Sequence, residues 1–209
     1  MSARDGFAPG VPCWVDTWRP DAEAALGFYT ALFGWQAEDT MPADSPGRHF
    51  MCRLGGSDVA AIASRPDAAP PGSGWNTYVW VENAEDSARR ATEAGGSLVM
   101  DAFDALDGGR IAVVADPADA VFGFWQPGAH KGARLVNEPG AWSMSGLITS
   151  DPEGAKRFYS AVFGWETDAF EVGGAEVTLW RLPGYVGGEP HQPVPRDVVA
   201  TMLPVAVLV

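Results

Sequence analysis

Residues 21–35, DAEAALGFYTALFGW, return 130 positions later as DPEGAKRFYSAVFGW at residues 151–165. The two stretches agree at nine positions, namely Asp, Glu, Ala, Phe, Tyr, Ala, Phe, Gly and Trp. Similarity of this length between two distant stretches indicates an internal duplication of the sequence. The chain is therefore expected to contain at least two copies of one structural unit.

Each copy has the pattern of a short amphipathic helix. Asp21 and Asp151 stand where a helix should begin, and Gly34 and Gly164 stand where it should end in a left-handed residue. The apolar positions between them follow helical spacing: Ala25, Phe28, Tyr29, Leu32 and Phe33 in the first copy, and Ala155, Phe158, Tyr159, Val162 and Phe163 in the second. We expect each helix to bury its Phe–Tyr face in a core.

Strand patterns surround these helices. Residues 12–127 contain the order strand, helix, strand, strand, strand twice, in modules 12–64 and 75–127 that are separated by a Pro/Gly-rich linker at 65–74. The second module has a weaker helix at 84–94, whose apolar side is made of alanines. A second linker, at 128–140, precedes a third module at 141–209.

Composition narrows the class of protein. With 46% hydrophobic residues the 209-residue chain can bury a substantial core. The formal charge of −13 argues against nucleic-acid partners and against binding to a membrane surface. Two cysteines, Cys13 and Cys52, do not make a disulfide framework in a chain of this size. No signal segment or spanning apolar run is apparent, so a cytoplasmic location is expected.

The helix motif DAEAALGFYTALFGW and the closing motif DPADAVFGFW at 116–125 resemble the vicinal oxygen chelate superfamily, which includes glyoxalase I, bleomycin-resistance proteins and extradiol dioxygenases. The chain is most similar to tandem two-domain glyoxalase-like proteins of actinobacteria. The resemblance implies an α+β fold in which paired βαβββ modules form a curved, cup-shaped mixed sheet with helices outside. It also implies that the cup holds the active site.

In metal-using members of this superfamily, a divalent cation such as zinc, nickel, iron or manganese chelates substrate oxygens in the cup. The ligand positions fall here on Trp14, Asn76 and Gly123, and on Met144 in the third module. None of these is a strong ligand, so no metal cofactor is expected at the usual positions, although a divalent metal stays possible. The three histidines, His49, His130 and His191, are predicted to be solvated.

Alternation along the strands identifies what else faces the cup. If Trp14 faces it, so do Asp16 and Trp18 from the same strand. The predicted ligand-binding residues are Trp14, Trp18, Asn76, Tyr78, Trp80, Gly123 and Trp125. Large rings with a few polar groups are typical of a site for a planar organic molecule. Alternatively, the tryptophans fill the cup and leave no cavity.

Asp16 is the one carboxylate predicted on this face and is a tentative catalytic residue. Two flanking indoles would partly desolvate it and raise its pKa toward the range of a general base. Alternatively, Asp16 caps a backbone group or accepts a hydrogen bond from an indole N–H.

Three functions remain open from the sequence. The first is a metal-free protein that sequesters or detoxifies a small aromatic compound. The second is a metal-dependent lyase or dioxygenase, for example a glyoxalase that acts on methylglyoxal–thiol adducts. The third is a structural or partner-binding module with a filled cup. The second domain is expected to stop after one module. Because the apolar sheet of this module has to be covered, we expect either a homo-oligomer or a disordered end of the chain.

Overall fold

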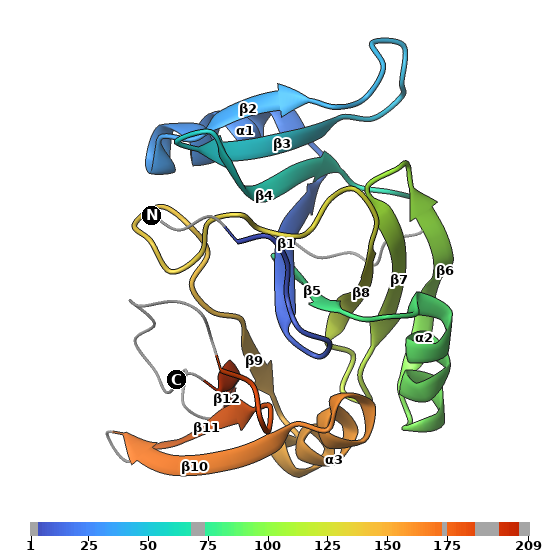
Figure 1. The fold of residues 1–209 in the computed structure, drawn as a ribbon, viewed down its shortest axis with the longest axis vertical. Coiled ribbons are helices and arrows are strands. Elements are labelled where there is room, and N and C mark those ends of the chain that lie inside the picture. The colour runs from blue at the N-terminus through green and yellow to red at the C-terminus, as the bar shows by residue number, and fades with distance from the viewer. Residues whose placement is uncertain (1–3, 68–73, 173–174, 187–196, 205–209) are drawn as a thin grey trace.

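The computed structural model describes residues 4–67, 74–172, 175–186 and 197–204. Its elements follow the order strand, helix, strand, strand, strand three times (Figure 1). In chain order they are β1 (Pro12–Arg19), α1 (Ala22–Phe33), β2 (Gln36–Asp39), β3 (His49–Leu54), β4 (Ser57–Ser64), β5 (Asn76–Trp80), α2 (Ala84–Glu93), β6 (Ser97–Ala105), β7 (Gly109–Ala115), β8 (Val121–Pro127), β9 (Gly146–Thr149), α3 (Pro152–Phe163), β10 (Glu166–Val172), β11 (Ala175–Arg181) and β12 (Val198–Pro204).

The described strands form two sheets. An eight-stranded sheet has the order β2-β3-β4-β1-β5-β8-β7-β6, and a four-stranded sheet has the order β10-β11-β12-β9. At the middle of the large sheet, β1 pairs in parallel with β4 of its own module and antiparallel with β5 of the next module. Two βαβββ modules thus share one curved mixed sheet with α1 and α2 outside it (Figure 1), which confirms the predicted α+β fold.

The helix ends are as the sequence predicts. The side chain of Asp21 accepts a hydrogen bond from the Ala24 backbone N–H at 2.8 Å, and Asp151 accepts one from Gly154 at the same distance. Gly34 and Gly164 close the helices with φ of 71° and 70°. Local sequence therefore determines where α1 and α3 begin and end.

The two copies of the duplicated helix differ in burial. In α3 the apolar face is in the core, with Phe158 only 1% exposed, because α3 packs against α2 and β8. In α1 the equivalent Phe28 is 62% exposed and Leu32 is 59% exposed. The predicted buried Phe–Tyr face is correct for α3 and wrong for α1. The reason is tertiary: none of the described residues cover α1 as α2 covers α3.

A reciprocal pair of contacts joins the first and third modules. The indole N–H of Trp35 donates to the carbonyl of Gly140 at 2.7 Å, and that of Trp165 donates to the carbonyl of Gly10 at 2.9 Å. Both the tryptophans and the glycines are 130 positions apart, and the two glycines share φ values of 81° and 82°. The first module therefore holds the segment before β9, and the third module holds the segment before β1. This exchange gives the two halves an approximate twofold relation.

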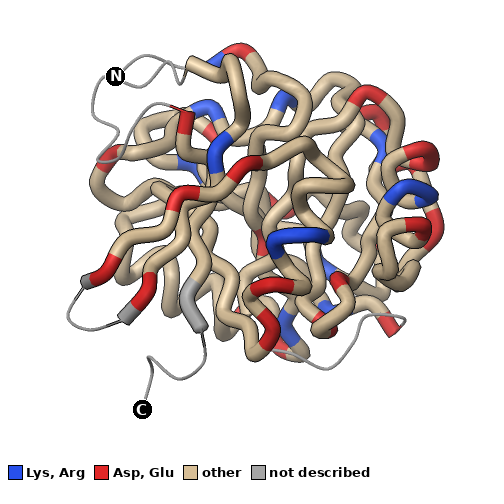
Figure 2. Tube along the Cα trace, turned by 90° about the horizontal axis from the view of Figure 1, so that it is seen from below, with Lys and Arg blue, Asp and Glu red and all other residues tan. Residues whose placement is uncertain are grey.

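The charged clusters repeat in the same way. Arg53 contacts Glu38 and Asp58, while Arg181 contacts Asp168 and Asp197. Each cluster lies within one module, and the two clusters occupy equivalent positions in the first and third modules. Figure 2 shows the basic residues dispersed among the more numerous acidic ones along the chain. In the part of the chain described, no helix is long and apolar enough to cross a bilayer.

Candidate functional site

The alternation of β1, β5 and β8 places the predicted residues on one concave face of the large sheet. Trp14, Tyr78 and Trp125 lie in a single cluster there and are 5%, 2% and 5% exposed. Trp18, Trp80 and Asn76 are half-buried around it. The structure therefore brings these side chains together, and ligand binding by them stays a prediction.

Asp16 lies at the polar centre of this face. Its carboxylate accepts hydrogen bonds from the Asn76 side-chain amide at 2.7 Å, the Tyr78 hydroxyl at 2.9 Å and the Trp18 indole N–H at 3.0 Å. The indole bond is the alternative that the sequence offered for this carboxylate. Burial nevertheless raises the pKa of Asp16 from 3.8 to about 6, because desolvation outweighs the three bonds to the ionised form.

Gly123 does not leave an open gap in the cup. A Cβ at this position would stand 2.2 Å from Cδ1 of the Tyr78 ring. The missing side chain therefore makes room for Tyr78, which in turn reaches Asp16. Gly123 was predicted among the ligand-binding residues, and in the structure the space beside it holds the Tyr78 ring.

The linker at 128–140 lies over the cup. The backbone N–H of Ala133 donates to the Cys13 carbonyl at 2.8 Å, and that of Arg134 donates to the Asp58 carbonyl at 2.8 Å. Ala133 and Val136 are buried in the same cluster as Trp14. The yellow segment in Figure 1 follows this path in front of β1 and β4. The deep part of the cup is therefore filled by the protein itself.

His130 enters the cup on this linker. Its ring lies 4.5 Å from that of Trp14 and 5.4 Å from that of Trp125, both edge-on, and burial lowers its pKa. The prediction that His130 is solvated is wrong, because the linker folds back onto the sheet. His49 is half-buried and bonds the Thr40 hydroxyl at 2.8 Å, so it too is not a freely solvated side chain. His191 lies outside the described residues.

The usual metal positions do not fit a metal ion here. Trp14 and Asn76 stand at two of them, and at Gly123 the available space holds the Tyr78 ring. Among the described residues, no group of three or more His, Cys, Asp or Glu side chains is placed to bind a cation. Met144, at the matching position of the third module, lies just before β9. No reaction step is therefore assigned to a metal at these positions.

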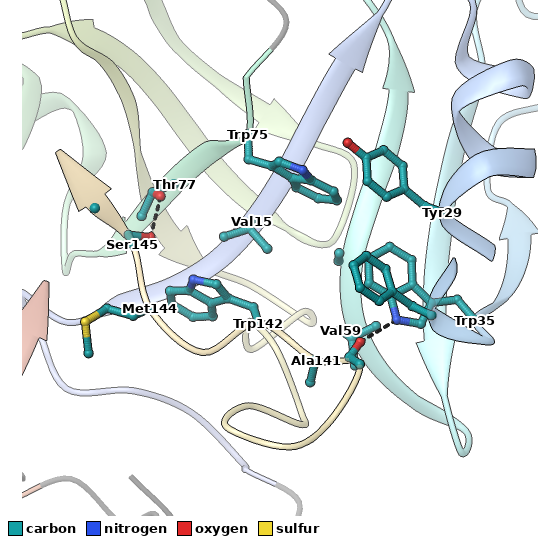
Figure 3. Close-up of a pocket in the computed structure, with 14 residues that line it drawn as sticks. Val15, Tyr29, Trp35, Val59, Trp75, Thr77, Ala141, Trp142, Met144 and Ser145 are labelled. Carbon is teal, nitrogen blue, oxygen red and sulfur yellow. Dashed lines mark hydrogen bonds between the residues drawn. The ribbon is translucent and has the colours of Figure 1, made fainter. Parts of the chain in front are cut away.

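A second concavity lies on the helix side of the sheet, between α1 and the segment before β9. Figure 3 shows Trp75, Trp142, Tyr29 and Trp35 arranged around it, with Val15 behind them. Its volume is about 330 Å³. Phe33, Val59, Ala60, Thr77, Gly140, Ala141, Met144, Ser145 and Gly146 complete the lining. We call this the aromatic pocket.

Few polar groups face the aromatic pocket. The hydroxyls of Thr77 and Ser145 bond each other at 2.6 Å and join β5 to the start of β9. The indole Nε1 of Trp142 is buried and has no hydrogen-bond partner among the described residues.

The sequence did not predict the aromatic pocket. Val15 and Thr77 lie on the face of the sheet opposite the cup, as alternation along β1 and β5 requires. Trp75 and Trp142, however, belong to segments outside any strand, where alternation says nothing about direction. The feature of the sequence that could have indicated the pocket is a tryptophan close after each linker, Trp75 after 65–74 and Trp142 after 128–140.

A related pocket of about 280 Å³ lies against α3. Tyr159 and Trp165 stand there at the positions that Tyr29 and Trp35 hold in the aromatic pocket. Val79, Val121 and Phe122 of the second module line the pocket at α3, and Trp75, Thr77, Ser145 and Gly146 line both pockets. The same duplicated motif thus encloses space beside both helices.

Known proteins place this geometry in a family. Residues 14–124 match the model of the Glyoxalase/Bleomycin resistance protein/Dioxygenase superfamily. The chain is 38% identical over 199 residues to "Putative glyoxylase CFP32" of Mycobacterium tuberculosis, a match covering 93% of this chain and 76% of that protein. It is 34% identical over 190 residues to "Anthracycline biosynthesis protein DnrV" of Streptomyces peucetius, covering 84% of this chain and 68% of that one.

Two solved structures share the fold. The Mn(II)-bound glyoxalase from Novosphingobium aromaticivorans aligns with a TM-score of 0.61 at 17% identity over 98% of this chain. A mutant of 4-hydroxymandelate synthase from Streptomyces coelicolor aligns with a TM-score of 0.58 at 14% identity over 95% of this chain. The chain spans 63% of the length of each. From the family match and the mycobacterial relative together, this chain belongs to the glyoxalase/bleomycin resistance protein/dioxygenase superfamily.

Proposed function

We propose that this protein binds a small, planar, uncharged organic molecule in the aromatic pocket and sequesters it without chemical conversion. The observation that carries the proposal is the group of aromatic rings around a space of about 330 Å³ (Figure 3). Pockets of this size, mostly apolar with a few polar groups, are typical of small-molecule sites. The hydroxyls of Thr77 and Ser145 are the polar groups that could orient a carbonyl or quinone oxygen.

The chemistry of the lining favours binding over catalysis. Apart from the Tyr29 phenol, the described residues that line the pocket include no carboxylate, imidazole, thiol or ammonium group. General acid–base or nucleophilic catalysis needs such a group within reach of the ligand. Aromatic stacking contributes about 0.5–1.5 kcal/mol per ring pair beyond area burial, so several rings could give micromolar affinity, about −8 kcal/mol, without chelation.

The relatives suggest a ligand class. One of them is named for anthracycline biosynthesis. Anthracyclines contain a planar anthraquinone within their four fused rings, and a flat ring system of that kind could lie between Trp75 and Trp142. We therefore propose polycyclic quinones as the first ligands to examine.

Binding of an uncharged tetracyclic anthraquinone should be measured by calorimetry with wild type and Trp142→Ala. We expect micromolar affinity for the wild type and a loss of about tenfold or more for the variant, because stacking on one indole contributes about 1–3 kcal/mol. Trp80→Ala is the matched control, since Trp80 lies at the edge of the cup and not in the aromatic pocket.

Two outcomes would contradict this assignment. If Trp80→Ala or Asp16→Asn abolishes binding while Trp142→Ala does not, the ligand binds in the cup. If purified protein contains stoichiometric zinc, nickel, iron or manganese bound by side chains, a metal-dependent lyase or dioxygenase becomes the better interpretation.

A further inference from the structure

We infer that the aromatic pocket and the pocket beside α3 form one binding site, which takes a flat ring system in the first and an uncharged aliphatic arm of the same ligand in the second. This inference rests on the proposed function and defines its ligand class more narrowly. We call the second cavity, of about 280 Å³, the α3 pocket. The two cavities adjoin, because they share four lining residues, namely Trp75, Thr77, Ser145 and Gly146.

The face of β1 and β5 that lies opposite the cup runs from one pocket into the other. In the register of these strands, Val15 lies opposite Thr77 and Pro12 lies opposite Val79. Val15 lines the aromatic pocket, while Pro12 and Val79 line the α3 pocket. Thr77 and Val79 are two residues apart on one strand, a distance of about 7 Å. An arm of a few atoms can therefore reach from one pocket into the other along this face.

The two pockets differ in the surface that they offer for stacking. Pro12 of the α3 pocket stands 130 positions before Trp142 of the aromatic pocket, at the equivalent place in the duplication. The Tyr159 and Trp165 rings of the α3 pocket stack on each other, with centroids 5.7 Å apart and planes 11° apart. Without an indole at the place of Trp142, the α3 pocket suits an aliphatic group better than a second flat ring.

The remaining lining of the α3 pocket agrees with an uncharged aliphatic group. None of the described residues that line it carries a charge, and a charged group would lose its hydration there without a partner. Six of the lining residues have aliphatic side chains, namely Val79, Ala120, Val121, Leu147, Ile148 and Ala200. Burial of methylene groups against such a surface is favourable in proportion to the apolar area removed from water.

Two hydroxyls mark the junction between the pockets. Thr77 and Ser145 bond each other at 2.6 Å (Figure 3), and this bond uses one of their two O–H donors. The other O–H can donate to an ether oxygen that passes between the pockets. The ligand class is therefore a polycyclic quinone that carries an aliphatic arm through an oxygen atom.

The combined size of the pockets fits such a molecule. Small-molecule sites typically have volumes of about 300–1,000 Å³. The aromatic pocket, at about 330 Å³, and the α3 pocket, at about 280 Å³, each lie near the lower end of this range, whereas the two together lie well within it.

The inference can be tested by calorimetry with two probes, the uncharged tetracyclic anthraquinone and the same compound as its n-butyl ether. We expect the ether to bind wild type about tenfold or more tightly than the parent compound, because its methylene groups are buried in the α3 pocket. Ile148→Trp and Val121→Phe should reduce this ratio to about threefold or less by narrowing that pocket. Ile148 is 53% exposed, so its variant should fold even if Val121→Phe does not.

Trp142→Ala is the matched control, since Trp142 lines the aromatic pocket and should weaken both probes while leaving their ratio unchanged. Equal binding of the two probes by wild type would overturn this inference and leave the proposed function standing. A ratio that survives Ile148→Trp would also overturn it, because the arm would then lie outside the α3 pocket. If neither probe binds wild type, the proposed function is wrong and the inference is wrong with it.

Discussion

Phe158→Ala is expected to lower the free energy of unfolding by about 3–5 kcal/mol, the range found for buried aromatic residues truncated in a core. Phe158 is 1% exposed, lies 6.2 Å from Phe122 between ring centroids and fills the space beside Gly96. Phe28→Ala, the same substitution at the same motif position, should change stability by only about 0.5 kcal/mol or less, because that side chain is 62% exposed.

Urea unfolding of wild type and both variants measures this difference directly. The dependence of unfolding free energy on urea should stay the same, so that a shift in the midpoint reports stability alone. Similar losses for Phe158→Ala and Phe28→Ala would show that α1 is covered in solution. Such a result would also indicate which face an oligomer uses.

The second prediction with a large effect is that Asp16 makes the free energy of unfolding depend on pH. Its pKa is raised from 3.8 to about 6 in the folded protein, chiefly by desolvation. Between about pH 4 and 6 the native state therefore holds a proton that the unfolded chain has released. The contribution of Asp16 to stability is then greatest below pH 4 and falls as pH rises toward 6, by up to about 3 kcal/mol.

Asp16→Asn removes this ionisation while keeping the shape of the side chain. The difference in unfolding free energy between wild type and Asp16→Asn should decrease by about 2–3 kcal/mol from pH 4 to pH 6.5 and stay level above that. The other carboxylates are common to both proteins and cancel in the subtraction. Urea unfolding at several pH values provides the measurement, and parallel profiles for the two proteins would falsify the raised pKa.

The sequence predicted those parts of the site that depend on strand alternation. Trp14, Asp16 and Trp18 share a face because successive side chains of β1 point to opposite sides. Asn76 and Tyr78 join them because β5 pairs with β1 in a register that sets Trp14 opposite Tyr78 and Asp16 opposite Asn76. The sequence did not predict that Tyr78 fills the space at Gly123, since that contact depends on the parallel pairing of β5 with β8.

The features of the site that the sequence did not predict involve residues outside the strands. His130 was expected in solvent, yet the linker carries it against Trp14 and Trp125. Trp142 was assigned no role, yet it forms a wall of the aromatic pocket. Neither segment has a periodic pattern, so its path over the protein depends on long-range contacts such as the bond from Ala133 to Cys13.

The sequence by itself determined the repeated βαβββ order, the ends of the duplicated helices and the faces of the strands, because capping residues, glycines and alternation act over a few neighbouring positions. Only the tertiary structure decided that Phe158 is buried and Phe28 is exposed, although the two motifs have similar sequences. Burial depends on whether another element covers the helix, and that element lies far away in the chain. α2 covers α3, and among the described residues α1 has no such partner.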